Sequence, residues 1–218
     1  MSRSGLRIAI DGPSGAGKST LARALAQELG LRYVDTGAMY RAVAWSAMQA
    51  GAESPQEVVA MLSRIELEID PDPERFRVRV GGVDVTEQLR DPVVGKRASE
   101  VAQIPAVRTW LMEAQRAEAG DGAVLEGRDI GTVVLRDADV KIFITAPEHV
   151  RMQRRAAQLG NPEVEQVEAD IRQRDRRDRQ RRASPLRAAD DAVIIDTGFE
   201  EPAASLRRIL DVVAARPR

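Results

Sequence analysis

Cysteine is absent from this chain of 218 residues, histidine occurs once, and aromatic residues contribute only 3%. Without cysteine there is no disulfide bond and no thiolate-bound metal, and this composition is typical of a reducing compartment. No uninterrupted apolar run approaches the roughly 20 residues that cross a bilayer, and no apolar leader precedes the first predicted strand. We therefore expect a cytoplasmic protein with no membrane partner.

The chain also has almost no net charge, because its 33 basic residues are balanced by 34 acidic residues. A nearly neutral chain has no global attraction to nucleic acid, and few aromatic side chains are present to stack on bases. We therefore expect no nucleic-acid partner. Lysine occurs only at Lys18, Lys96 and Lys141, so arginine supplies nearly all the positive charge and any basic site must be local.

What the chain does contain is a glycine-rich stretch that fits the pattern G-x-x-x-x-G-K-[ST]. An apolar run precedes it and helically spaced leucines follow it, which is the strand, loop and helix context of a phosphate-binding loop. Glycines let backbone N–H groups turn inward around phosphates, the Lys18 ammonium can reach the β- and γ-phosphates, and the Ser19 hydroxyl can bind Mg²⁺. The residues expected to bind ATP here are Gly12, Pro13, Ser14, Gly15, Ala16, Gly17, Lys18, Ser19 and Thr20.

Short apolar segments alternate with helix-length segments along most of the chain. Strands are expected at residues 6–10, 32–35, 123–126, 140–145 and 192–196, and helices at 38–50, 147–159, 163–182 and 202–215. Strands separated by helices pair in parallel, and open α/β sheets bind ligands at the carboxyl ends of their strands. The predicted fold is therefore α/β, with a five-stranded parallel core sheet.

Between residues 66 and 85 the apolar period changes from helical spacing to alternation. Gly81 and Gly82 separate two alternating runs, which is a hairpin signal, and Ser54 and Glu57 form a capping box for a helix just before. A mostly helical segment, 95–120, follows, with a break predicted before Pro105. The three antiparallel strands are expected to be an inserted subdomain that clamps a substrate, and a decorative insert is the alternative.

The helix predicted at 163–182 carries Val164, Val167 and Ile171 on one face, followed on the same face by Arg174, Asp178 and Arg181. Two interpretations of this switch from apolar to ionic residues stay open. Either the charged residues face a wet cleft, or the helix simply projects past the core at this point.

A phosphate loop is shared by GTPases, motor ATPases and small kinases, so other residues must separate these classes. No lysine follows Asn or Thr, which excludes the guanine-reading pattern [NT]-K-x-D, and no D-x-x-G occurs. The strand at 140–145 ends in Thr145 and lacks the terminal acid that motor ATPases require. A small kinase with an anionic acceptor needs mainly positioning and charge neutralisation by Mg²⁺, lysine and arginines, which suits this chain.

Five segments together resemble bacterial cytidylate kinases of the P-loop nucleoside monophosphate (NMP) kinase family, in the family's order. They are residues 11–20, 33–41, 126–134, 141–145 and 174–181. The resemblance implies ATP-dependent phosphorylation of CMP and dCMP in pyrimidine metabolism, with ATP as co-substrate and Mg²⁺ as cofactor. It also implies a three-layer NMP-kinase-like fold with a core (1–35, 111–150 and 183–218), an NMP-binding insert (36–110) and a helical lid with its following helix (151–182). We expect a monomer.

The same resemblance assigns roles to individual residues. Arg41, Arg128 and Arg181 would hold the acceptor phosphate, and Lys18, Arg128 and Arg181 would be the catalytic charges. Arg174 and Asp178 would bind the ribose, and Ser99, Arg108 and Asp129 would recognise cytosine, with Thr36 also beside CMP. The lid residues Arg154 and Arg155 would meet the ATP phosphates.

Asp35 has two open roles, since a carboxylate at a strand end can hold a magnesium-bound water or cap the next turn. The arginines of the predicted lid, Arg151 among them, would repel one another in an empty site, and we expect phosphates to draw this segment closed.

Two further hypotheses stay open. The reaction can be the same with another acceptor, such as UMP, another nucleotide or a shikimate-like metabolite, and a comparison of acceptors would discriminate these. The segment 172–182 can instead bind nucleic acid, although Asp175 and Asp178 interrupt its positive charge.

Overall fold

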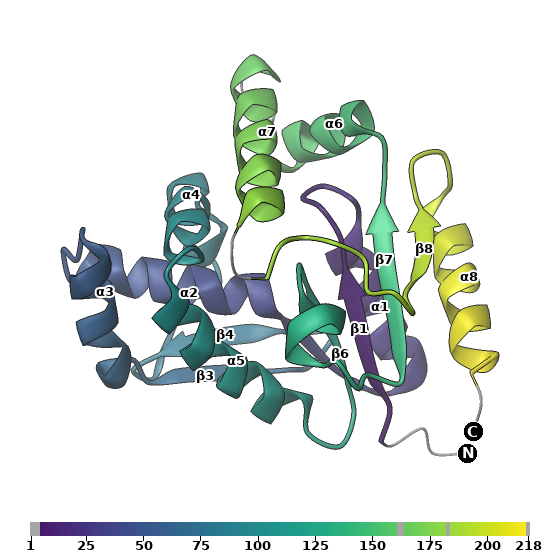
Figure 1. Cartoon of the computed structure of the whole chain (residues 1–218), viewed down its shortest axis with the longest axis horizontal. Coiled ribbons are helices and arrows are strands. Elements are labelled where there is room, and N and C mark those ends of the chain that lie inside the picture. The colour runs from purple at the N-terminus through teal and green to yellow at the C-terminus, as the bar shows by residue number, and fades with distance from the viewer. Residues whose placement is uncertain (1–4, 161–163, 182–183, 217–218) are drawn as a thin grey trace.

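Five parallel strands form the central sheet, in the order β2-β6-β1-β7-β8 (Figure 1). The structure is a computed structural model that describes residues 5–160, 164–181 and 184–216. The strands are β1 (Arg7–Asp11), β2 (Arg32–Asp35), β6 (Ala123–Gly127), β7 (Val140–Thr145) and β8 (Val193–Asp196). The predicted strands and their parallel pairing are confirmed, with ends that agree to within one residue.

Helices cover both faces of this sheet because successive side chains of a strand point to opposite faces. In β1, Ile8 and Ile10 pack in the cluster beneath α1 (Lys18–Leu29) and α8 (Pro202–Ala214), whereas Ala9 belongs to the cluster of the opposite face. That opposite face is covered by α2 (Thr36–Gln49) and α5 (Pro105–Ala119). The three-layer arrangement places β1, and the loop that follows it, at the centre of the molecule.

The segment between β2 and α5 forms the predicted insert with its antiparallel sheet. Ser54 and Glu57 make the expected capping box, and the break before Pro105 is confirmed. The elements of the insert after α2 are α3 (Pro55–Met61), the 3₁₀ turn η1 (Leu62–Arg64), β3 (Leu67–Asp70), β4 (Arg77–Val80), β5 (Val83–Asp84), the 3₁₀ turn η2 (Gln88–Arg90) and α4 (Pro92–Val101).

The insert and the parallel sheet share one hydrophobic cluster. Val58 of α3 and Val94 of α4 belong to the same buried cluster as Ala9 of β1 and Leu125 of β6. The expected boundary between residues 110 and 111 falls inside α5, which contributes Val107 and Leu111 to this cluster. The insert therefore depends on the main sheet for its core.

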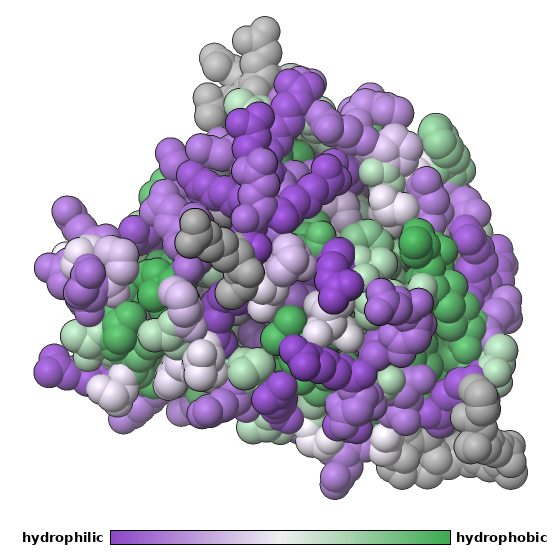
Figure 2. Space-filling view, viewed as in Figure 1, coloured by the Kyte–Doolittle hydropathy of each residue, from purple (hydrophilic) through white to green (hydrophobic). Residues whose placement is uncertain are grey.

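Two helices stand beyond the carboxyl ends of the strands, namely α6 (Glu148–Gln158) and α7 (Val164–Gln180) (Figure 1). They pack on each other through Met152, Ala156 and Ile171, and hydrophilic side chains dominate their surface in Figure 2. The predicted ends of the second helix, Glu163 and Arg182, lie outside the described residues. A π-helical turn, η3 (Ile130–Val134), follows β6 and was not predicted.

Over the described ranges, none of the helices combines the length and the apolar character needed to cross a lipid bilayer.

The shared cluster predicts that the insert does not unfold separately. Val58 is fully buried, whereas its neighbour Val59 is 39% exposed. Val58→Ala should lower the free energy of unfolding by about 2 kcal/mol because it removes buried methyl groups and leaves a cavity. Val59→Ala should change it by less than about 0.5 kcal/mol. In denaturant titrations the first variant should still show one cooperative transition, and a separate early transition would contradict the shared core.

Candidate active site

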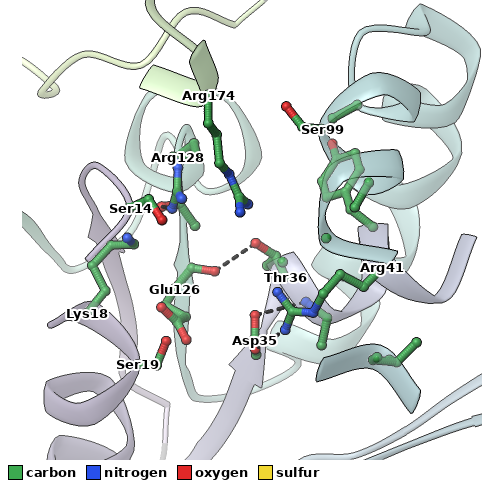
Figure 3. Close-up of a pocket in the computed structure, with 18 of the residues that line it drawn as sticks. Ser14, Lys18, Ser19, Asp35, Thr36, Arg41, Ser99, Glu126, Arg128 and Arg174 are labelled. Atoms are coloured by element: carbon green, nitrogen blue, oxygen red, sulfur yellow. Dashed lines mark hydrogen bonds and ion pairs between the residues drawn. The ribbon is translucent and has the colours of Figure 1, made fainter. Parts of the chain in front are cut away.

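A cavity of about 490 Å³ lies where β1, β2 and β6 end, between the loop after β1 and the helices α2, α4 and α7. Figure 3 shows Lys18 and Ser14 on one side of it, Arg41 and Ser99 on the other, and Arg174 extending into it from α7. The cavity brings together residues from segments that are far apart in the sequence. Of the predicted site residues, those that line it are Ser14, Gly15, Gly17, Lys18, Ser19, Thr20, Asp35, Thr36, Arg41, Ser99, Arg108, Arg128, Asp129, Arg155, Arg174, Asp178 and Arg181.

The loop from Gly12 to Gly17 has a backbone that only glycine permits at its tightest points. A Cβ on Gly12 would lie 2.0 Å from the carbonyl oxygen of Ile144, and a Cβ on Gly15 would lie 2.6 Å from the carbonyl oxygen of Arg151. Gly17 has φ 89 and precedes α1 without a side-chain cap. The first N–H groups of α1 are therefore available to an anion at the positive end of the helix dipole.

Lys18 is buried, and its ammonium donates to the carbonyl oxygen of Pro13 over 2.7 Å. Burial, followed by the nearby charge of Arg128, lowers the pKa of Lys18 from 10.5 to about 7. A cation held in these surroundings gains from any anion that enters the cavity. The loop and Lys18 together have the donors and the positive charge that a phosphate group requires.

Two carboxylates end neighbouring strands at the floor of the cavity, Asp35 on β2 and Glu126 on β6, which are paired in the sheet register. Asp35 accepts from the N–H of Ala38 at 2.9 Å and from Arg41 at 2.7 Å. Burial alone would raise the pKa of Asp35, but the Arg41 charge and the bond from Ala38 bring it below its ordinary value. The capping role expected for Asp35 is therefore observed, and α2 begins at Thr36 instead of the expected Ala38.

Glu126 has the opposite electrostatic environment. It accepts a hydrogen bond from the Tyr33 hydroxyl at 2.6 Å, and the Ser19 side chain lies beside it (Figure 3). Burial and the negative charge of Asp35 raise the pKa of the Glu126 carboxyl. The Thr36 hydroxyl donates to the carbonyl oxygen of Glu126 at 2.7 Å, so Thr36 lines the cavity while its hydroxyl binds the backbone.

Arginines converge on the middle of the cavity from the loop after β6 and from α7. Arg128 donates to Asp178 at 3.0 Å, and Asp178 also lies 3.8 Å from Arg181. Burial and the Arg128 charge lower the pKa of Arg174 to about 10. Arg174, Asp178 and Arg181 all line the cavity, so the cleft-facing interpretation of this helix face is confirmed.

A cluster of hydrogen-bonding groups closes the end of the cavity beneath α4 and α5. Arg108 forms a hydrogen-bonded ion pair with Asp129, and its guanidinium lies 5.7 Å from the ring centre of Tyr40. The Ser99 hydroxyl is buried and has no protein partner among the described residues. Tyr40 was not predicted from the sequence, although it lies one residue before Arg41 on the same helix.

Two arginines of α6 differ from expectation. Arg154 donates to the hydroxyl and the carbonyl oxygen of Thr197 at 3.0 and 2.7 Å and does not line the cavity; nor do Gly12, Pro13 and Ala16. Arg151 is buried, pairs with Asp175 at 2.7 Å and donates to the carbonyl oxygen of Ser14 at 3.0 Å. α7 therefore supplies a counter-charge for Arg151, which reduces the repulsion expected among the arginines of this segment.

The acids at the ends of β1 and β6 were not predicted as site residues. The strand at 140–145 ends without an acid, but β6 flanks β1 just as β7 does, and Glu126 supplies a carboxylate there. Asp11, at the end of β1, is 4% exposed and accepts the N–H groups of Ile130 and Gly131, each at 2.8 Å. An acidic residue at the end of an apolar strand is the signal that would have identified both.

The phosphate loop is surrounded by more cationic side chains than a folded core requires. An enzyme that brings two polyanionic substrates together needs such a group of cations. With the loop placed directly after the central strand of a parallel sheet, these features define a phosphotransferase of the P-loop kinase class. The family model described as cytidylate kinase matches residues 8–214. The chain belongs to the cytidylate kinase family.

Individual relatives agree with this assignment. A cytidylate kinase of Desulfitobacterium hafniense is 48% identical over 199 residues, which cover 88% of this chain and 85% of the relative. A cytidylate kinase of Rhodococcus jostii is 44% identical over 224 residues, which cover 99% and 98%. A solved structure, an uncharacterized protein from Eubacterium ventriosum, aligns with a TM-score of 0.56 at 14% identity over 97% of this chain and 99% of that one, so it shows a likeness of fold alone.

The buried Asp11 carboxyl predicts a pH dependence of stability. Burial raises the pKa of Asp11 from 3.8 to about 6. A pKa raised in the folded state stabilises the fold fully below pH 3.8, and this stabilisation disappears as the pH rises through 6. Relative to Asp11→Asn, the wild-type free energy of unfolding should therefore fall by about 2 kcal/mol between pH 4 and 7. Denaturant unfolding of both proteins across this range checks the trend, and a constant difference would contradict it.

Proposed function

We propose that the chain transfers the γ-phosphoryl group of ATP to CMP and to dCMP. The observation that carries this proposal is the continuity of one cavity, which runs from a phosphate loop past a group of arginines to the Ser99, Arg108 and Asp129 cluster. The two ends suit a triphosphate and a base, and the arginines between them suit the phosphates that react.

The ATP end of the cavity is the loop before α1. Its backbone N–H groups and Lys18 bind the β- and γ-phosphates, and Arg155 from α6 adds charge from the opposite wall. The pKa of Arg155 is lowered by burial and by the charge of Arg41, so the bound phosphates neutralise two groups that repel each other in their absence. Arg154 reaches the phosphates only after it leaves Thr197.

The acceptor phosphate binds between Arg41 and Arg128, with Arg174 and Arg181 beside it. A phosphate oxygen is already anionic, so it needs no strong general base to attack the γ-phosphorus. The cations instead hold two mutually repelling phosphates in line and neutralise the charge of the transferring group. Asp178 keeps Arg128 turned toward the cavity through its 3.0 Å bond.

The base of CMP binds at the Ser99, Arg108 and Asp129 cluster. Cytosine presents an amino donor at position 4 and an acceptor at N3, whereas uracil presents an acceptor and then a donor. The Asp129 carboxylate can accept from the amino group, and the Ser99 hydroxyl has no partner in the part of the chain that the structure describes, so this cluster matches cytosine. Uracil would place its carbonyl oxygen against a carboxylate, and both acceptors would be left unpaired.

The donor set at the floor of the cavity fits Mg²⁺. The Ser19 hydroxyl and the Glu126 carboxylate lie side by side, with Asp35 on the neighbouring strand, and hard oxygen ligands of this kind are those that Mg²⁺ prefers. Within the described residues no group of three or more acidic or histidine side chains could hold a metal ion by itself. When bound, the ion would neutralise charge on the β- and γ-phosphates.

Acceptor preference tests the function directly. ADP release should be fastest with CMP and dCMP and much slower with UMP, AMP and shikimate at equal concentrations. A faster reaction with UMP, AMP or shikimate would reject the assignment in favour of another P-loop kinase activity.

The expectations of a monomer and of a cytoplasmic location remain proposals from the sequence. Sedimentation equilibrium tests the expected monomer.

Glu126→Gln should raise the Mg²⁺ concentration that gives half-maximal activity by about tenfold or more, since glutamine keeps the shape but loses the charge. Calorimetry of ATP binding with and without Mg²⁺ provides a readout that needs no turnover, and the gain in affinity from the metal should shrink. Glu118→Gln, on α5 and outside the cavity, is the matched control. An unchanged metal dependence in the Glu126 variant would remove this residue from the metal site.

Asp129→Asn should lower kcat/KM for CMP and narrow the preference for CMP over UMP by about 100-fold or more, because sites that bind a substrate hydrogen-bonding group discriminate strongly against analogues without it. Asp178→Asn is the comparison, since its carboxylate lies in the same cavity and faces Arg128. Asp178→Asn should lower kcat/KM for CMP and for UMP by a similar factor. If Asp129→Asn also lowered kcat/KM for both acceptors equally, Asp129 would support the loop instead of recognising the base.

A further inference from the structure

Asp11 ends the central strand immediately before the phosphate loop, yet its side chain does not line the cavity. It is buried, and both of its oxygens accept backbone N–H groups from another part of the chain. One oxygen accepts from Ile130 and the other from Gly131, each at 2.8 Å. A carboxylate in such surroundings depends on these two bonds, because burial without partners is costly.

The two amides that Asp11 binds belong to the first turn of η3, the π-helical turn after β6. The residue at the N-cap position of this turn is Asp129, and Asp129 makes no side-chain cap bond. Aspartate at an N-cap ordinarily turns its carboxylate back onto the N–H of the second or third residue of its own helix, which here are Gly131 and Thr132. The N–H of Gly131 is already occupied by Asp11.

This division of roles frees the Asp129 carboxylate. Instead of capping η3, it pairs with Arg108 at the base end of the cavity. The backbone of Asp129 is held separately, because its carbonyl oxygen accepts from the N–H groups of Val133 and Val134. Asp129 is therefore fixed at its backbone and open to the cavity at its side chain.

The sheet register places Asp11 beside the start of the loop that follows β6. Asp11 pairs with Gly127 of β6, so the segment 128–131 leaves the sheet directly beside it. There is no room for a side chain at Gly127, where a Cβ would lie 2.7 Å from both Ile130 and the Thr36 hydroxyl. The loop is consequently pressed against the end of β1, with the Asp11 carboxylate beneath it.

We propose that Asp11 is a positioning residue for base selection, which caps η3 in place of Asp129 and so leaves the Asp129 carboxylate facing the acceptor base. This inference rests on the proposed role of Asp129 in recognising cytosine. It extends that role by naming the residue that determines which way Asp129 points.

The test uses Asp11→Asn, which replaces one acceptor with an amide donor facing an N–H group. The Asp129 carboxylate should then rotate to cap η3 and leave Arg108. We expect kcat/KM for CMP to fall by about tenfold or more while kcat/KM for UMP changes by less than about threefold. The KM for ATP should stay the same, although Asp11 adjoins the phosphate loop in the sequence.

Two further variants distinguish positioning from simple support of the fold. Asp139→Asn is the matched control, because Asp139 accepts the N–H of Arg7 at 2.7 Å at the opposite end of the same strand, and it should leave the CMP to UMP ratio unchanged. In the double variant Asp11→Asn with Asp129→Asn, the ratio should equal that of Asp129→Asn alone. A CMP to UMP ratio in the double variant that falls below that of Asp129→Asn would overturn the proposal. Equal losses of kcat/KM with CMP and with UMP in the single Asp11 variant would also overturn it.

A substrate-free measurement separates this inference from the role of Asp129 itself. A crystal structure of Asp11→Asn should show the Asp129 carboxylate on the amide of Gly131 or Thr132, and an Asp129 that still pairs with Arg108 would overturn the inference whatever the kinetics show. If Asp11→Asn does not fold, Asp11→Ala, which removes both acceptors without adding a donor, is used in its place. If the CMP to UMP ratio is unchanged in Asp129→Asn while Asp129 is rotated in the Asp11 variant, Asp129 does not recognise the base. Asp11 would in that case still determine the orientation of Asp129.

Discussion

Repulsion between like charges in a buried cavity is the constraint on which the rest of this structure depends. The arginines that surround the phosphate loop would not stay together without carboxylates that hold them individually. Arg41 is held by Asp35, Arg108 by Asp129, Arg128 by Asp178 and Arg151 by Asp175. Each pair joins two different elements or an element and a loop, so the pairs that neutralise the charge also fix the shape of the site.

Among the described residues, Lys18 and Arg174 line the cavity without forming an ion pair, and we propose that anionic substrates bind beside them. Lys18 and Arg174 have lowered pKa values because burial and the Arg128 charge oppose their protonated forms. Such buried charges lower the stability of the folded chain, and the protein regains this stability when phosphate binds. At a charged site, residues that serve function often lower stability in this way.

The sequence predicted most of the fold because periodicity and glycine positions report local structure directly. The strands, the antiparallel insert and the phosphate loop followed from these signals, and the alternation of strands with helices gave the parallel sheet. Side-chain partners could not be predicted in the same way. Asp11 with the amides of η3, Arg151 with Asp175, and Arg154 with Thr197 join residues that are distant in the chain, and no local pattern encodes them. The π-helical turn at Ile130 escaped prediction for the same reason, since its first amides are capped from β1.

The common core of the insert and the main sheet also limits how this enzyme can be altered by recombination. An insert that buried its own apolar face could be exchanged as a cassette between P-loop kinases to change the acceptor. Here Val58 and Val94 pack in one cluster with Ala9 and Leu125. A transplanted insert would therefore lack the main-sheet residues of its core, and the recipient sheet would be left with a packing defect. New acceptors are therefore more accessible through single substitutions at the closed end of the cavity than through the exchange of whole segments.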